Sequence, residues 1–130
     1  MTIAKSTRII HGENGGAARA AITTTDAYQW IVLSATSPIL LPAYRVINGY
    51  DGGDDEAVEL TVLASEADLS GAVDPTDQRW IKIVDADTLT AESDTQATID
   101  ASRYFTIAVG VKSNAVGVHS DLYAMLTGAV

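Results

Sequence analysis

Apolar and polar residues alternate along much of the chain, which is the pattern of a β-strand with one buried face and one exposed face. In Ala57–Ser65 (AVELTVLAS), Val58, Leu60 and Val62 share one face, and the polar residues between them share the other. A half-buried strand in an antiparallel sheet has this composition. The segment therefore predicts a strand that packs one face on a core.

Two further segments have the same period. In Arg103–Lys112 (RYFTIAVGVK) every second residue is apolar, and we expect this face to point into the core: Phe105, Ile107, Val109 and Val111. In Arg79–Val84 (RWIKIV), Ile81 and Ile83 alternate with Trp80 and Lys82. The pattern also predicts strands at Tyr28–Ser34, Ala43–Ile47, Thr95–Ile99 and Val116–Leu126, and weaker ones near Thr2–Ile10 and Ala18–Thr24.

Short turn-forming segments separate these runs, and no long amphipathic helix is visible. Ser65–Gly71 could form one helical turn capped by Ser65. Eight or nine short strands at this spacing predict an all-β fold, an antiparallel β-sandwich of immunoglobulin-like or jelly-roll-like type.

The stretch Asp100–Tyr104 bears on whether the sandwich is immunoglobulin-like or jelly-roll-like. Its D-x-(small)-x-Y spacing, followed by an alternating run, resembles the tyrosine corner of immunoglobulin-like sandwiches. Thr106 stands where an antibody-type domain carries cysteine, which excludes that subfamily. An equal alternative is that Asp100 starts a turn and Tyr104 is an ordinary strand residue.

The composition excludes several classes of protein. A chain of 130 residues suggests one domain, and the absence of cysteine excludes disulfide scaffolds, thiolate metal sites and thiol nucleophiles. We expect a soluble protein, because no signal peptide or membrane-spanning run is visible. The net charge of −9 disfavours nucleic-acid binding, which depends on basic residues.

The charge is unevenly distributed. Residues 1–20 carry three basic residues and one acidic residue (+2), whereas residues 21–130 carry five basic and sixteen acidic residues (−11). This asymmetry suggests a basic arm on an acidic body. We therefore divide the chain into an extended N-terminal arm with a Gly-rich hinge (1–16) and a single β-sandwich domain (17–130).

The arm is the candidate partner-binding segment, through three isoleucines interleaved with two basic residues: Ile3, Lys5, Arg8, Ile9 and Ile10. On one interpretation it leaves its own body and adds to a neighbour's sheet or acidic surface. On the other it is the first edge strand of its own domain, where the basic residues guard against edge pairing. The second interpretation has the greater weight.

No residues are predicted to be catalytic or to bind a cofactor. His119-Ser120-Asp121 contains the residue types of a catalytic triad, but adjacent strand residues point to alternate faces. His11 has no evident partner. Gly12–Gly16 lacks the Lys-Ser/Thr of a phosphate-binding loop and suggests a hinge.

The acidic loop Asp51–Glu56 (DGGDDE) is the best metal candidate, because clustered carboxylates suit Ca²⁺. Asp85, Asp87, Glu92 and Asp94 could converge on it. The loop does not match EF-hand spacing, and solvated acidic turns are common, so we assign no metal site.

As a whole the chain resembles the capsid decoration (cement) proteins of bacteriophages. The likeness lies in the Ala/Thr/Asp-rich acidic body, the extended N-terminus, the absence of cysteine and the alternating C-terminal segment. It implies a non-enzymatic virion subunit on the capsid surface, bound to the major capsid protein or to itself as a homotrimer, without nucleic acid or membrane. Two alternatives stay open: a carbohydrate- or ligand-binding sandwich with Trp30, Tyr50, Trp80 and Tyr123 as its aromatic platform, and a small-virus coat protein.

Overall fold

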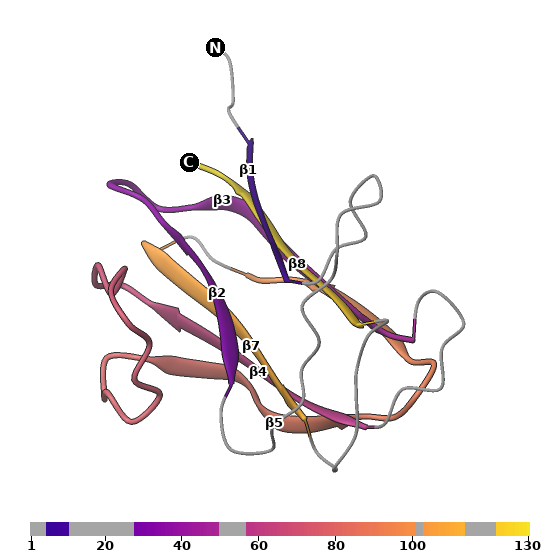
Figure 1. Cartoon of the computed structure of the whole chain (residues 1–130). Helices are drawn as coiled ribbons and strands as arrows, with labels where there is room; N and C mark the ends of the chain where they lie inside the picture. Colours follow the sequence, from indigo (N-terminus) through magenta and orange to yellow (C-terminus); the bar gives the residue numbers. More distant parts are fainter. Residues whose placement is uncertain (1–4, 11–27, 50–56, 101–102, 114–121) are drawn as a thin grey trace.

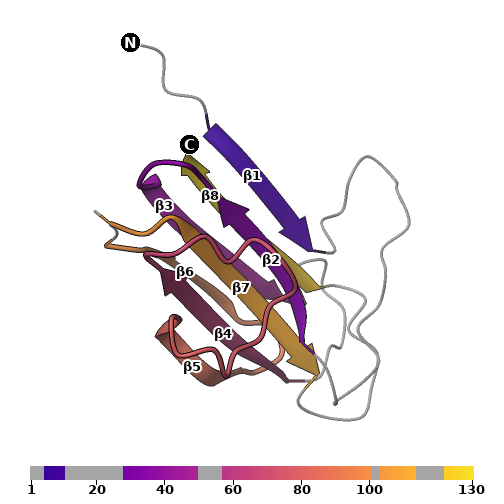
Figure 2. The same ribbon diagram turned by 90° about the vertical axis from the view of Figure 1, so that its left-hand side faces the viewer.

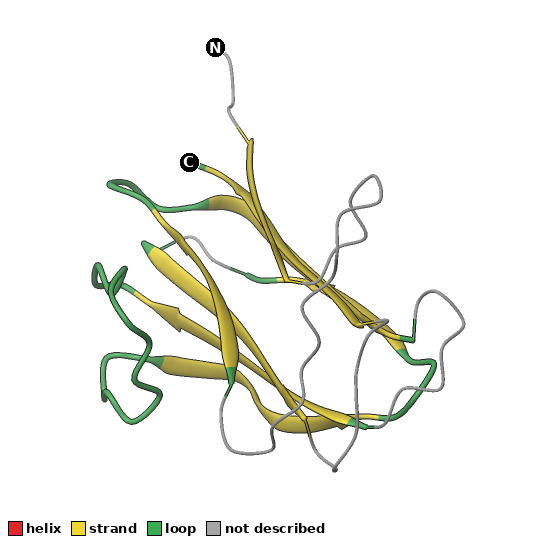
Figure 3. Cartoon of the chain, in the orientation of Figure 1, coloured by secondary structure: helices red, strands yellow, loops and turns green. Residues whose placement is uncertain are grey.

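The computed structural model describes residues 5–10, 28–49, 57–100, 103–113 and 122–130. All regular structure in these ranges is β-strand, and they contain no helix (Figure 3). The eight strands are β1 (Lys5–Ile10), β2 (Gln29–Ser34), β3 (Leu40–Asn48), β4 (Val58–Ser65), β5 (Ile81–Leu89), β6 (Asp94–Thr98), β7 (Thr106–Ser113) and β8 (Leu122–Ala129).

The strands form two four-stranded antiparallel sheets that face each other (Figure 1). The β1 sheet has the order β1-β8-β3-β6, and the β2 sheet has the order β2-β7-β4-β5. Strand β1 pairs with β8, β2 with β7, β3 with β6 and β4 with β5, as if one long hairpin had been rolled up. This is the eight-stranded jelly roll. The first two strands of an immunoglobulin-type sandwich share a sheet, but here β1 and β2 lie in different sheets.

Strand β1 belongs to the sandwich. Its six residues pair with β8 in unbroken register, from Lys5 opposite Ala129 to Ile10 opposite Ala124. Residues 5–10 are thus the edge strand of the domain's own sheet, which is the second of the two interpretations given above. The reason is that an alternating segment gains ladder hydrogen bonds by pairing with the nearest open edge.

The core lies between the sheets and follows the predicted alternation. Val58, Leu60 and Val62 of β4 are buried there. Strand β7 contributes Ile107, Val109 and Val111. Residues of β2, β3 and β8 complete it, among them Leu33, Val46, Leu122, Ala124 and Leu126. The predicted all-β sandwich is therefore confirmed.

Four details of the sequence prediction are wrong. Phe105 is only half-buried, because it precedes β7. Ile81 and Ile83 are exposed; β5 is an edge strand whose register with β4 shifts twice, which interrupts the regular alternation of its faces. Ser65 ends β4 instead of capping a helical turn, and its hydroxyl accepts a hydrogen bond from the backbone N–H of Ala67 at 3.0 Å. The sheet order excludes the immunoglobulin-type corner at Tyr104, which packs against the core ahead of β7.

Candidate functional site

Several residues singled out in the sequence lie outside the described ranges. They are Ile3, His11, the Gly12–Gly16 segment, the acidic loop Asp51–Glu56, Tyr50 and the run His119–Asp121. The strand predicted at Ala18–Thr24 also lies there. The roles considered for these residues stay predictions.

The four arm residues inside β1 are placed by register only. Lys5, Arg8, Ile9 and Ile10 lie opposite Ala129, Leu126, Met125 and Ala124 of β8. Their proposed contact with a partner stays a prediction.

One carboxylate of β5 and the carboxylate of β6 are engaged locally. Asp85 lies 3.5 Å from Lys82, and both oxygens of Asp94 accept hydrogen bonds from Arg45, at 3.1 and 2.7 Å. The hydrogen bonds from Arg45 hold the pKa of Asp94 below its ordinary value. Among the described residues, no group of three or more His, Asp or Glu side chains is placed to hold a metal ion.

The two tryptophans lie on the outer face of the β2 sheet, the face turned away from the core. Trp80 is buried with Leu63 and Ala108 in a second apolar cluster, which partly buried Leu69 and Val73 also contact. Residues 66–80 connect β4 to β5, and this connection crosses in front of β7 in Figure 2. Trp80 is therefore a core residue of this small cluster and is not available as a binding platform.

Trp30 is half-buried and lies across Gly110 of β7, its register partner. A Cβ atom added at Gly110 would come within 2.4 Å of the Trp30 ring. The ring of Tyr28 lies beside it, with ring centroids 5.0 Å apart. Glycine at position 110 is thus what allows the indole to approach the sheet so closely.

A polar network fixes Tyr28. Its hydroxyl donates to Glu59 Oε2 at 3.0 Å and accepts from the Thr61 hydroxyl at 3.0 Å. The Lys112 ammonium lies 3.1 Å from the same Glu59 oxygen and 5.1 Å from the centre of the Tyr28 ring. Burial raises the pKa of Tyr28. The network holds two adjacent aromatic rings in a fixed arrangement, half-exposed on the sheet.

Among the residues that the structure describes, the most exposed large apolar side chains lie at one corner of the β1 sheet. Leu40 pairs with Ala129, and Leu41 and Val130 are their chain neighbours. Their exposed fractions are 51% for Leu40, 71% for Leu41 and 46% for Val130. We call these three residues the apolar corner.

The backbone at the corner is strained. Leu41 has φ = 53°, a left-handed conformation that costs a non-glycine residue about 1–2 kcal/mol. The register with β8 shifts between Leu40 and Ala43, so Leu41 sits in a bulge. Ile39 beneath it is fully buried against Gly128. The bulge thus leaves the Leu41 side chain exposed to solvent, two residues after the buried Ile39.

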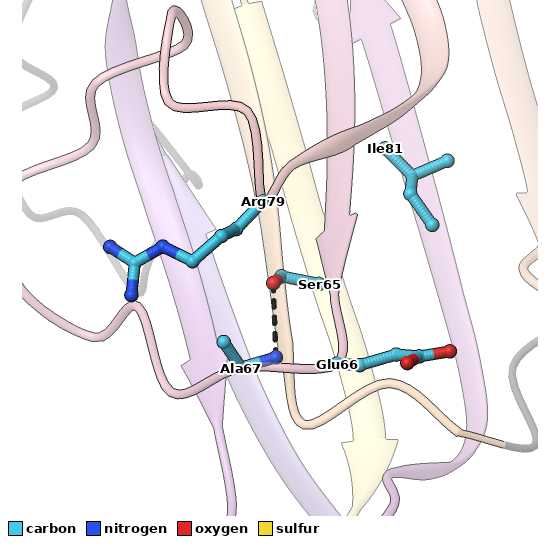
Figure 4. Close-up of a pocket in the computed structure, with 5 residues that line it drawn as sticks. All are labelled: Ser65, Glu66, Ala67, Arg79 and Ile81. Carbon is cyan, nitrogen blue, oxygen red and sulfur yellow. Dashed lines mark hydrogen bonds between the residues drawn. The ribbon is translucent and has the colours of Figure 1, made fainter.

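An open pocket of about 400 Å³ lies between the end of β4 and the start of β5 (Figure 4). Ser65, Glu66, Ala67, Arg79 and Ile81 line it. The two charged side chains that line the pocket, Glu66 and Arg79, form ion pairs with residues outside the pocket. Glu66 lies 3.0 Å from Arg103, and Arg79 forms a two-pronged ion pair with Asp77 at 3.1 and 2.7 Å.

The adjoining connection is shaped by aspartates that cap their own turns. Asp68, Asp74 and Asp77 each accept a hydrogen bond from the backbone N–H two residues later. The hydrogen bonds from Arg79 lower the pKa of Asp77 to about 2. These carboxylates stabilise the loop, as aspartates in turns commonly do, and in the described structure no nucleophile and base are seen aligned beside them.

Sequence reasoning missed the apolar corner. The only available signal was the run Ile39-Leu40-Leu41 before Pro42, which has more consecutive apolar residues than an alternating strand requires.

Comparisons with known proteins give no family. No protein-family model matches the chain, and no curated protein matches it significantly. Among solved structures it is similar to the mitogen from Yersinia pseudotuberculosis, with a TM-score of 0.48 and 10% identity over 99% of this chain and 87% of that one. A likeness at this level carries no functional argument. Within the described ranges, no helix is long and apolar enough to cross a membrane.

Proposed function

We propose that this chain is a non-enzymatic structural subunit that decorates and stabilises a bacteriophage capsid, and that it contacts its neighbours through the apolar corner. The neighbours would be the major capsid protein, other copies of the chain, or both. The observation that carries the proposal is Leu41, which is 71% exposed at φ = 53°.

The argument from Leu41 is energetic. Within the isolated chain, its backbone conformation costs free energy and its side chain buries little apolar surface. Full burial of a leucine side chain on a partner is worth about 1.5–3 kcal/mol. A partner that covers the apolar corner would therefore offset the free energy that the backbone conformation of Leu41 costs. Unusual backbone conformations of this kind cluster at functional positions.

The fold supports the proposal by analogy alone. Jelly rolls occur in viral capsid proteins and also in lectins, so the architecture does not choose between them. The local pairing of charges around the Figure 4 pocket fits a structural role better than a catalytic one.

The test uses particles purified from the virus that encodes the chain. We expect mass spectrometry to find the chain as a regular shell component. Particles stripped of it should rebind the wild-type chain, whereas Leu41→Gly should bind about 10–100-fold more weakly, because about 1.4 kcal/mol corresponds to a factor of ten. Since glycine tolerates φ = 53°, this variant should be as stable as the wild type or more stable.

Ile81→Ala is the matched control, because Ile81 is an exposed apolar residue outside the corner. It should rebind like the wild type. Absence of the chain from the particles would overturn the virion assignment, and full rebinding by Leu41→Gly would overturn the role of the corner.

A second candidate function, carbohydrate binding, is favoured by the Tyr28–Trp30 pair on the outer face. A half-exposed indole flanked by donors and acceptors is suited to bind a sugar ring. Trp30→Ala should then abolish retardation of the chain in gels that contain soluble β-glucan or xylan. Normal mobility of the wild-type chain in both gels would remove this candidate.

A further inference from the structure

Asn48 is a buried polar residue at the last position of β3. Its side chain is fully buried, and its Nδ2 donates hydrogen bonds to the backbone carbonyls of Leu89 and Thr90, at 3.3 and 3.2 Å. Its backbone N–H donates to the carbonyl of Ser93 at 2.8 Å. Asn48 therefore ties the end of β3 in one sheet to the turn that leads out of β5 in the other sheet and into β6.

The residue that follows Asn48 gives this side chain a chemical reactivity. Gly49 has no side chain to hinder the approach of its nitrogen, so an Asn-Gly pair reacts with itself more readily than other pairs do. The Gly49 nitrogen bonds to the side-chain carbonyl carbon of Asn48 and gives up its proton, and Nδ2 leaves as ammonia. Water then opens the resulting succinimide ring to aspartate or isoaspartate. The reaction needs no enzyme and no metal.

The native fold opposes both steps of this reaction. Ring closure requires the side-chain carbonyl carbon of Asn48 to reach the Gly49 nitrogen, and the two hydrogen bonds of Nδ2 restrain that movement. Gly49 is itself buried, with φ = 81°, a conformation that glycine adopts without strain. Water, which opens the ring, has no access to a side chain that is 0% exposed.

We propose that Asn48-Gly49 is a deamidation site that the folded β5–β6 turn keeps unreacted, and that its reaction after a local opening prevents the turn from closing again. Native proteins open locally at a smaller free energy than global unfolding requires. An opening of this turn frees Nδ2 and admits water to Asn48. The site therefore converts a reversible opening into a permanent change.

Neither product fits the native site. An aspartate at position 48 has no hydrogen to donate to the carbonyls of Leu89 and Thr90, and its charge would be buried without a partner. Isoaspartate adds a backbone atom to the chain where Asn48 pairs with Leu122 of β8, and this extra atom disturbs the register. Both products therefore favour the open turn.

This inference does not depend on the proposed function. The apolar corner lies at the first residues of β3, whereas Asn48 is the last residue of that strand. The experiments below use the isolated full chain and include no capsid, so their failure leaves the role of the apolar corner untouched.

The first test compares deamidation in the native chain with deamidation in urea, in mildly alkaline buffer, by mass spectrometry of the peptide that contains Asn48. Asn14-Gly15, the same dipeptide elsewhere in the chain, is the reference for the intrinsic rate in urea. We expect Asn48 to react in urea at a rate similar to that of Asn14, and at least roughly tenfold more slowly in the native chain. Equal rates for Asn48 in the two conditions would refute the protection.

The second test loosens the turn without touching Asn48. The hydroxyls of Thr90 and Ser93 lie 2.9 Å apart and hydrogen bond across the turn. Thr90→Val should speed the native reaction of Asn48 about two- to tenfold, the factor expected from the loss of one hydrogen bond, and leave the rate in urea unchanged. Thr98→Val is the matched control, because Thr98 is an exposed threonine at the far end of β6; it should leave both rates unchanged. An unchanged native rate in Thr90→Val would refute the role of the turn.

The third test concerns the return to the folded state. Chains that have partly reacted in urea are diluted into native buffer, and the folded fraction is isolated by size-exclusion chromatography. Chains deamidated at Asn48 should be depleted from this fraction at least roughly tenfold relative to the starting mixture, since a buried charge without a partner is strongly destabilising. Equal abundance in the folded fraction and in the mixture would overturn the claim that the reaction prevents closure.

Discussion

Gly110 lies in the middle of β7, directly beneath the indole ring of Trp30. A methyl group there would meet three ring carbons at 2.4–2.8 Å, well inside van der Waals contact. Neither residue can move easily, because β7 is paired on both sides and Trp30 contacts the Tyr28 ring. Gly110→Ala should therefore lower the free energy of unfolding by about 1–3 kcal/mol, the usual range for overpacking.

The same substitution should have the opposite effect once the ring is gone. The backbone of Gly110 is not in the left-handed region, so alanine fits its conformation. In a Trp30→Ala background, Gly110→Ala should stabilise the protein by up to about 1 kcal/mol, since alanine restricts the unfolded chain more than glycine does. A double-mutant cycle isolates this coupling.

Urea denaturation followed by circular dichroism measures all four proteins of the cycle. As a control, the cycle is repeated with Trp80→Phe in place of Trp30→Ala. No atom of Trp80 is among the nearest neighbours of the methyl group added at Gly110. If Gly110→Ala has the same effect with and without the Trp30 ring, the steric argument is refuted.

Two other predictions follow from burial and charge. Ile107→Ala should lower the unfolding free energy by about 2–5 kcal/mol, whereas Phe105→Ala should have a smaller effect because Phe105 is only half-buried; equal losses in urea denaturation would contradict the placement of Phe105. Because the folded-state pKa of Asp77 is lowered to about 2, its contribution is present above pH 4 and is lost as the pH falls from about 4 to 2. Asp77→Asn should therefore flatten the loss of thermal stability over this interval, and an unchanged pH profile would refute the linkage.

Sequence reasoning recovered the strands and most core positions. In Val58–Ser65 and Thr106–Ser113 the side chains alternate between two environments, and this period is local information. It failed at Ile81 and Ile83, which have the same period but are exposed. The residues of a strand do not show where its register with a neighbouring strand shifts, and the register of β5 with β4 shifts twice.

The candidate surfaces were less predictable. The conformation of Leu41 depends on the register between β3 and β8, two strands that lie far apart in the sequence. The pairing of Trp30 with Gly110 likewise joins positions that are 80 residues apart along the chain numbering. Neither pairing produces a sequence motif within a single segment of the chain.

The sequence by itself determined an all-β chain, the inward faces of its central strands and the absence of cysteine chemistry, because each follows from residue type and local period. Tertiary structure alone decided the jelly-roll order, the place of β1 within the sandwich, and the exposure of Leu41 and of β6. These depend on which strands become neighbours, and that choice is made by the summed packing and hydrogen bonding of segments distant in the chain.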